Sequence, residues 1–316
     1  MEHRQMAIYL LALILGMSLG SEPGFRAAAA LALWPALASL LFITFLQIPL
    51  LRLKAAITDF RFLGSMMLGE ALLVPLLVAA LLKLLPAEPG LRLGVALVLL
   101  APCTDWFVSF SLLGRGDSTR ALASTPLRLL LQIVSVPLWL ALLVPGELAW
   151  IELGRLAPAV LLIAVPLVLA VILEQMPKAL RENLREGTRR LMVPLLAAVI
   201  VFVAGAQPLS LGELAGWLPS LLGVFAAYLI LAAFLARLLA ALFRLPPAQG
   251  RTLAYGFGTR NSFVVLPIAL VLPEPLSIAA MVIVLQALVE LLGMLVYLAA
   301  LVRLFPDRNE IRVRTT

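Results

Sequence analysis

The sequence has little charge, one cysteine and one histidine, and each scarcity excludes a class of protein. Only 13% of its 316 residues are charged and 63% are hydrophobic, whereas about a quarter of a soluble domain is charged. A water-soluble core cannot bury so much apolar surface, so the composition indicates a membrane protein. The single cysteine, Cys103, excludes a disulfide framework, and the single histidine, His3, excludes a histidine cluster. We expect no bound cofactor.

The sequence consists largely of long hydrophobic runs. A membrane-spanning helix needs about 20 predominantly apolar residues, and charged or Pro/Gly-rich segments separate the runs. They predict ten spans, at 5–20, 27–51, 62–85, 91–113, 119–145, 154–175, 190–206, 213–243, 250–272 and 275–305. The alternative for the first run is a cleaved signal peptide, which would leave nine spans. The segment that follows the run lacks a clear A-x-A cleavage site, which favours a span.

The basic residues predict the orientation in the membrane. With the amino terminus in the cytoplasm, most of the 24 Lys and Arg residues, Arg128 among them, fall on the inner side. The hydrophilic segment 176–190 is then a cytoplasmic connector, expected to lie on the membrane as an amphipathic helix, and 306–316 is a cytoplasmic tail. The positive charge thus reflects topology in a bacterial-type inner (plasma) membrane, with both termini cytoplasmic, and not binding to nucleic acid.

The arrangement of the predicted spans indicates an inverted repeat. A division near residue 155 leaves five spans on each side, so two similar halves would enter the membrane in opposite directions. The fourth span of each half is interrupted, at Pro102–Asp105 and at Tyr255–Ser262. Interruptions at matching positions indicate a substrate site near the midplane. The predicted fold is an all-α membrane protein with ten transmembrane helices in two inverted five-helix repeats, of which helices four and nine are discontinuous.

The two interruptions carry side chains that can bind a solute. Two of them, Asp105 and Arg260, are each costly inside a membrane, and the simplest solution is that they pair. The alternatives are that either one faces a water-filled vestibule, or that Arg260 extends to the interface. Cys103 can be a small buried hydrophobe or a soft ligand for a thiophilic substrate such as a metalloid. The candidates for substrate binding are Cys103, Thr104, Asp105, Arg260, Asn261 and Ser262.

Carboxylates inside the spans are candidates for carrying a coupled proton. Glu290 in the last span and Asp105 in the first interruption have this position. Glu70 in the third span ranks lower, because it lies closer to the inner end and can reach the interface. Asp117, or one of the two residues after it, is expected to cap the fifth span.

Residues 101–138, APCTDWFVSFSLLGRGDSTRALASTPLRLLLQIVSVPL, resemble the region of spans four and five in the bile acid/sodium symporter superfamily, and within it the arsenite permeases. The matching elements are Cys103, Gly116-Asp117, Leu131–Ile133 with Pro137, Asn261, Phe263 and Glu290. The resemblance implies a panel bundle (1–58 and 154–206; spans 1, 2, 6 and 7) and a core bundle (60–146 and 212–305; spans 3–5 and 8–10). It also implies that the two broken helices cross in the core.

The function that this resemblance implies is proton-coupled efflux of arsenite or antimonite, with Cys103 at the site and Glu290 or Asp105 as the proton carrier. Bile acid symporters place a Glu and a Gln in the second interruption for sodium, and Gly256 and Arg260 are the corresponding residues here. A permanent cation at that place repels Na⁺, which favours protons as the coupling ion.

Three other functions are compatible with parts of the sequence. The first is a carrier for a small organic anion bound by Arg260, coupled to sodium or protons. The second is a membrane enzyme that uses Asp105, Glu290 and Ser262, which the lack of a metal-ligand set disfavours. The third is a channel, for which paired interruptions in inverted halves give little support. The expected partners are thus a metalloid, a small inorganic oxyanion or a small organic anion, together with protons and lipid.

Overall fold

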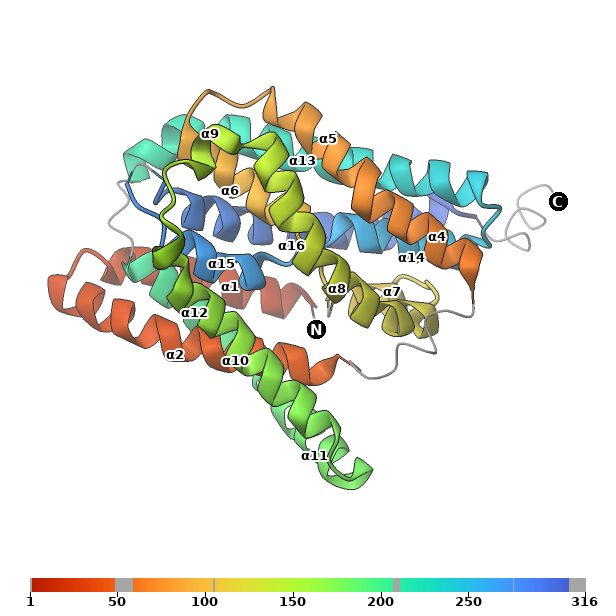
Figure 1. Ribbon diagram of the computed structural model, residues 1–316, viewed down its shortest axis with the longest axis horizontal. Helices are drawn as coiled ribbons and strands as arrows, with labels where there is room; N and C mark the ends of the chain where they lie inside the picture. Colours follow the sequence, from red (N-terminus) through yellow and green to blue (C-terminus); the bar gives the residue numbers. More distant parts are fainter. Residues whose placement is uncertain (1, 49–58, 105, 207–210, 275, 307–316) are drawn as a thin grey trace.

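The computed structural model describes residues 2–48, 59–104, 106–206, 211–274 and 276–306, and this part of the chain is helical with no extended sheet. Figure 1 shows the arrangement of the helices. In chain order the elements are α1 (Glu2–Leu19), α2 (Pro23–Gln47), α4 (Phe60–Leu68), the π-helix η1 (Gly69–Leu73), α5 (Val74–Leu82), α6 (Pro89–Leu100), α7 (Trp106–Leu113), α8 (Ser118–Leu143), α9 (Pro145–Leu148), the 3₁₀-helix η2 (Leu153–Leu156), α10 (Ala157–Glu174), α11 (Lys178–Arg189), α12 (Met192–Ala206), α13 (Leu211–Leu242), α14 (Pro247–Gly258), α15 (Ser262–Leu270) and α16 (Ala279–Leu304).

Six helices in the described ranges are long and apolar enough to cross a membrane. They are Pro23–Gln47, Phe60–Leu82, Ser118–Leu143, Gly154–Glu174, Gly216–Leu242 and Ala279–Leu304. A seventh candidate is the pair Ala179–Arg189 and Met192–Ala206, which is bent by 50°. The protein is therefore a multi-pass membrane protein. The other predicted spans fall on shorter helices or broken pairs (α1, α6 with α7, α12, α14 with α15), so ten spans and an inverted repeat stay predictions.

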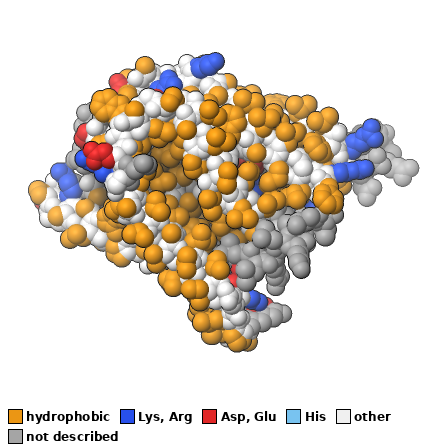
Figure 2. Space-filling model, viewed as in Figure 1, with side chains coloured by type: hydrophobic (Ala, Val, Ile, Leu, Met, Phe, Trp, Pro, Cys, Tyr) orange, Lys and Arg blue, Asp and Glu red, His pale blue; other side chains and the backbone are white. Residues whose placement is uncertain are grey.

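The exposed surface of the longest helices is apolar. In the most hydrophobic window of Gly154–Glu174, only 17% of the residues are buried, and side chains such as Leu161 and Val168 are more than half exposed. Figure 2 shows hydrophobic side chains over the middle of one face, with charged side chains mainly around its edges. A belt of this kind is stable in lipid and would be costly in water.

The helices pack in two groups around the broken ones. Helix α2 packs against α10 and α12, and α1 packs against α12; α13 packs against α14 and α16, and α6 against α8 and α16. In α6 and α14 nearly every residue is buried. A helix that is buried on all sides lies in the interior of its bundle, so α6 and α14 carry their carboxyl ends into the centre of the protein.

Local chemistry explains where these two helices end. Pro102 has no N–H group, and its ring disfavours helical geometry at the preceding residue. Accordingly, α6 ends at Leu100, and Ala101 is extended with φ −91° and ψ 107°. Helix α14 ends at Gly258, and Thr259 is extended with φ −92° and ψ 134°. Both interruptions are therefore short extended segments.

The two extended segments cross and bond to each other through an isolated antiparallel bridge. The Cys103 N–H donates to the Thr259 carbonyl at 3.3 Å, and the Asn261 N–H donates to the Ala101 carbonyl at 2.7 Å. Backbone groups that leave a helix inside a membrane need such partners, because lipid offers none. The crossing therefore supplies partners for backbone groups that the broken helices leave unbonded.

A polar network joins the amino-terminal ends of α4, α8 and α14. Asp59 caps α4 through the Phe62 N–H, and Asp117 caps α8 as the sequence predicts. Arg120 bonds both carboxylates, with Nε 2.8 Å from Asp59 Oδ2, and Gln249 of α14 donates to the same oxygen at 3.2 Å. Burial raises the pKa of Asp59, but these donors outweigh burial and hold the net pKa below its ordinary value.

The π-helical turn brings the third span close to α14, and this contact is testable at Gly69. A Cβ atom at Gly69 would lie 2.1 Å from the Phe257 ring, whereas one at Gly64 on the same span would lie 3.5 Å from its nearest neighbour. Because overpacking costs about 1–3 kcal/mol, we expect Gly69→Ala to lower the thermal unfolding midpoint in detergent and Gly64→Ala to leave it nearly unchanged. Equal midpoints for the two variants would contradict the close approach.

Candidate functional site

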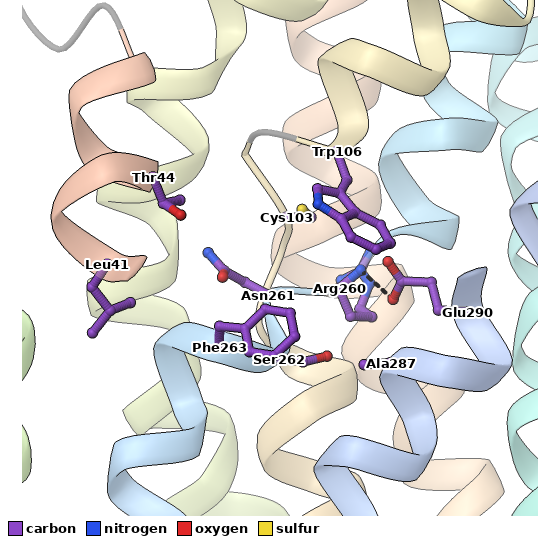
Figure 3. A pocket seen from close by; sticks show the side chains of 10 residues that line it. All are labelled: Leu41, Thr44, Cys103, Trp106, Arg260, Asn261, Ser262, Phe263, Ala287 and Glu290. Carbon is purple, nitrogen blue, oxygen red and sulfur yellow. Dashed lines mark hydrogen bonds between the residues drawn. The ribbon is translucent and has the colours of Figure 1, made fainter. Parts of the chain in front are cut away.

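A small pocket lies beside the crossing of the two interruptions. Its lining comes from α2 (Leu41, Thr44), the first interruption and the start of α7 (Cys103, Trp106), the second interruption and the start of α15 (Arg260, Asn261, Ser262, Phe263), and α16 (Ala287, Glu290). Figure 3 shows Asn261 on the side of α2 and Glu290 on the opposite side, with Cys103 and Trp106 between them. The pocket therefore combines a thiol, a carboxylate, an amide and hydroxyl groups.

Most of the residues that the sequence singles out meet here. Five of them line the pocket, namely Cys103, Arg260, Asn261, Ser262 and Glu290. Thr104 is buried, and its hydroxyl has no hydrogen-bond partner among the described residues. Asp105 lies outside the described residues, so its predicted pairing and proton-carrying role remain predictions.

Glu290 holds the second interruption from α16. Its Oε2 accepts the backbone N–H of Arg260 at 2.8 Å, which is the dashed line in Figure 3, and the Nε2 of Gln286 at 2.8 Å. The Oε1 of Gln286 in turn accepts the hydroxyl of Ser262 at 2.8 Å. A carboxylate on a neighbouring helix thus binds an N–H that the broken helix leaves without an intrahelical partner.

Asn261 and Gln132, which both belong to motifs that resemble the symporter superfamily, form a hydrogen bond beside the pocket. The Nδ2 of Asn261 donates to the Oε1 of Gln132 on α8 at 3.3 Å, and both residues are buried. A buried amide pair of this kind satisfies polar groups that lipid cannot. It links the second interruption to the fifth span, in addition to the backbone bonds that link it to the first interruption.

The guanidinium of Arg260 is held by the protein. Its Nη1 donates to Glu70 Oε2 at 3.1 Å and to the Leu99 carbonyl at 3.3 Å. Its Nη2 donates to Glu70 Oε1 at 3.3 Å, to the Gly256 carbonyl at 3.0 Å and to the Phe257 carbonyl at 2.7 Å. The side chains of both charged partners are at most 1% exposed. The expectation that Glu70 extends to the interface is therefore wrong, because this carboxylate is a buried partner of Arg260.

A second guanidinium binds the same carboxylate. Arg128 Nη2 lies 2.9 Å from Glu70 Oε1 and 2.9 Å from the Gly256 carbonyl, and its Cζ lies 4.3 Å from the centroid of the Phe107 ring. The sequence interpretation placed Arg128 at the inner side, and the structure shows that the residue is fully buried among the helices. Arg128 lies ten residues into α8, about 15 Å along the helix axis. The signal in the sequence that could have indicated its burial is its position as an isolated cation in an apolar run.

We call Glu70, Arg128 and Arg260 the arginine–glutamate cluster. In this cluster two guanidiniums share one carboxylate, and a second carboxylate, that of Glu290, lies beside it on the backbone N–H of Arg260. Buried charges persist only when they are paired and hydrogen-bonded. Glu70 lies on the π-helical turn η1, and such turns are frequent at functional sites.

The fold and the site together define a class of protein. Discontinuous helices that meet in the interior of an apolar bundle, with polar and charged groups at their ends, are typical of secondary transporters. The model of the Sodium Bile acid symporter family matches residues 34–209, more than half of the chain, and the chain belongs to this family. No curated protein matches the chain. Family membership makes ion-coupled transport of a small molecule or ion the class of function.

The arginine–glutamate cluster gives a test of stability. Glu70→Gln leaves two buried guanidiniums without their shared carboxylate, and breaking a buried ion pair on one side costs about 3–5 kcal/mol. We expect a large loss of folded protein and a lower unfolding midpoint in detergent. The matched control is Glu147→Gln, whose partner Arg92 is 30% exposed, since such a pair contributes about 1 kcal/mol or less. Similar midpoints for both variants would show that Glu70 is not a structural anchor.

Proposed function

We propose that the protein exports arsenite or antimonite in exchange for protons, by alternating access at the crossing of the two broken helices. The observation that carries this proposal is the position of Cys103, the chain's one cysteine, in the wall of the pocket at the crossing. Sulfur is the preferred ligand of thiophilic metalloids. A single thiol binds such a substrate less tightly than a cage of three thiols would, and a carrier has to release what it binds.

The remaining lining supports a small hydroxylated substrate. Near neutral pH arsenite is an uncharged trihydroxide, so its recognition needs hydrogen-bonding groups more than a fixed opposite charge. Thr44, Asn261 and Ser262 supply hydroxyl and amide groups within the same pocket. Thr104, buried beside Cys103 with its hydroxyl lacking a partner in the described part of the chain, is a further candidate.

We assign the coupled proton to Glu290, with Asp105 as the second candidate. Glu290 lines the pocket and binds the backbone of the second interruption. Protonation of Glu290 would leave the two guanidiniums facing only one carboxylate, so proton binding changes the net charge beside the pocket. Substrate and proton can therefore influence each other at one place, which is what exchange requires.

Alternating access needs two bodies that move against each other. We infer that α1, α2, α10 and α12 form the panel bundle and that the other long helices form the core bundle. The pocket lies at their boundary, since Leu41 and Thr44 belong to α2 and the other lining residues belong to the core helices. With both termini in the cytoplasm of a bacterial-type inner membrane, α2 would run from the outer to the inner side, which would put Leu41 and Thr44 toward the inner end of this helix.

A carrier for a small organic anion is the second candidate, because Arg260 lines the pocket. Two observations rank it lower. The Arg260 guanidinium already donates to Glu70 and to three carbonyls, and the Glu290 carboxylate would repel an anion at the same pocket.

The first test replaces the sulfur. In an arsenite-sensitive host, we expect Cys103→Ser to abolish the resistance that the parent protein confers, because oxygen is a poor substitute for sulfur toward trivalent arsenic. Ser111→Ala, a change of one atom on α7 away from the pocket lining, is the matched control and should retain resistance. Membrane extracts should contain equal amounts of each variant. Undiminished resistance in Cys103→Ser would remove the metalloid proposal and leave the organic-anion carrier in the lead.

The second test removes the titratable proton. Glu290→Gln keeps an oxygen for the Arg260 N–H but cannot ionise, and it carries the charge of the protonated state. In inverted membrane vesicles we expect exchange of labelled arsenite across a membrane without a gradient to continue, while accumulation driven by a pH gradient is lost. Glu147→Gln should behave as the parent protein in both assays. Gradient-driven accumulation that survives in Glu290→Gln would shift the proton to Asp105 or to another group.

A further inference from the structure

The oxygen atoms around the Arg260 guanidinium have the composition of a cation site. They are both carboxylate oxygens of Glu70 and the carbonyl oxygens of Leu99, Gly256 and Phe257, all within 3.3 Å of a guanidinium nitrogen. The three carbonyls belong to the last turns of α6 and α14. Carbonyls in the last turn of a helix lack intrahelical donors and carry partial negative charge, and in transporters with broken helices such carbonyls coordinate the coupling cation.

We propose that Arg260 is a resident cation: its guanidinium fills a monovalent-cation site formed by Glu70 and the carbonyls of Leu99, Gly256 and Phe257, so this member of the family transports without sodium. The sodium ion that the family's description implies does not fit the residues present. The inference concerns the ion site alone and does not depend on the identity of the substrate.

Charge and packing both oppose a sodium ion at this place. A bound Na⁺ would be a third positive charge beside the guanidiniums of Arg128 and Arg260, and repulsion between like charges is strong in a buried site. The Arg260 guanidinium also contacts an aromatic ring, because its Cζ lies 5.6 Å from the centroid of the Tyr228 ring. The hydroxyl of Tyr228 donates to the Phe257 carbonyl at 2.7 Å, which holds one of the ligands in place.

Truncation of Arg260 should convert the filled site into a vacant one. Arg260→Ala removes one positive charge from the two carboxylates nearby, so Glu70 keeps the guanidinium of Arg128 as its one charged partner among the described residues and Glu290 stays beside the site. The carbonyls of α6 and α14 that bonded the guanidinium would lose this donor. A diffusible monovalent cation would restore both the charge balance and the contacts. Because the acceptors fit a guanidinium, free guanidinium ion and potassium are suitable probes together with sodium.

The experiment compares thermal unfolding midpoints of the purified full chain in detergent, in choline, sodium, potassium and guanidinium chlorides at equal low ionic strength. We expect the parent protein to unfold at the same temperature in choline and in sodium. Arg260→Ala should unfold at a lower temperature in choline, and at least one of the other cations should restore about half of the loss or more with saturable dependence, as linked ligand binding requires.

The matched control is the double variant Arg260→Ala with Glu70→Gln. Without the Glu70 carboxylate this protein lacks the charged ligand of the proposed cation site, so the midpoint should be the same in all four salts. This control separates occupancy of the site from general effects of salt.

Two results would overturn the proposal. The first is a saturable stabilisation of the parent protein by sodium over choline. The second is a folded Arg260→Ala variant that responds to none of the cations. If Arg260→Ala yields no folded protein, the proposal is tested by the sodium response of the parent protein and of Arg260→Lys. Arg260→Lys keeps a positive charge on the chain, so sodium should not raise its unfolding midpoint over that in choline. Failure of the arsenite assays would leave each of these measurements unaffected.

Discussion

The structure depends on the ion pairs between Glu70 and two buried arginines. Glu70 lies on the π-helical turn of the third span, Arg128 on α8 and Arg260 in the interruption after α14. These bonds connect three segments in the buried interior, where an unpaired charge costs several kcal/mol. The same guanidiniums bond carbonyls of the last turns of α6 and α14. The cluster therefore supplies hydrogen-bond donors to carbonyls that the broken helices leave unbonded, and it also pairs the buried charges.

The cluster also determines the chemistry of the pocket. Arg260 contributes to the wall, but its donor groups point to Glu70 and to backbone carbonyls. What remains for a solute is the thiol of Cys103, the carboxylate of Glu290 and neighbouring hydroxyl and amide groups. These groups are the ones on which the proposed exchange of arsenite for protons rests, and the carboxylate is a repulsive element for anions. The proposed resident cation and the proposed substrate thus depend on one arrangement.

Much of the candidate site could be predicted from the sequence because backbone chemistry marks it. Pro102 is followed by the polar residues Thr104 and Asp105, and together they mark the first interruption, whereas Pro126 and Pro137 lie inside α8. The polar stretch from Thr259 to Ser262 marks the second interruption. Opposed interruptions in a helical bundle have to satisfy each other's backbone groups. For this reason Cys103 and Asn261 could be expected at one place before any contact was known.

The sequence by itself determined that the chain is an apolar membrane protein, where its hydrophobic runs end and which two of them are broken, because these properties follow from composition and local backbone chemistry. Only the tertiary structure decided that Arg260 meets Glu70 and that Arg128 is buried beside them. A partner across the bundle depends on how each helix is rotated and on the extra residue in the π-helical turn that carries Glu70. Hydrophobic runs that are apolar on all sides do not encode this rotation, because every face of such a helix is compatible with lipid or with a neighbour.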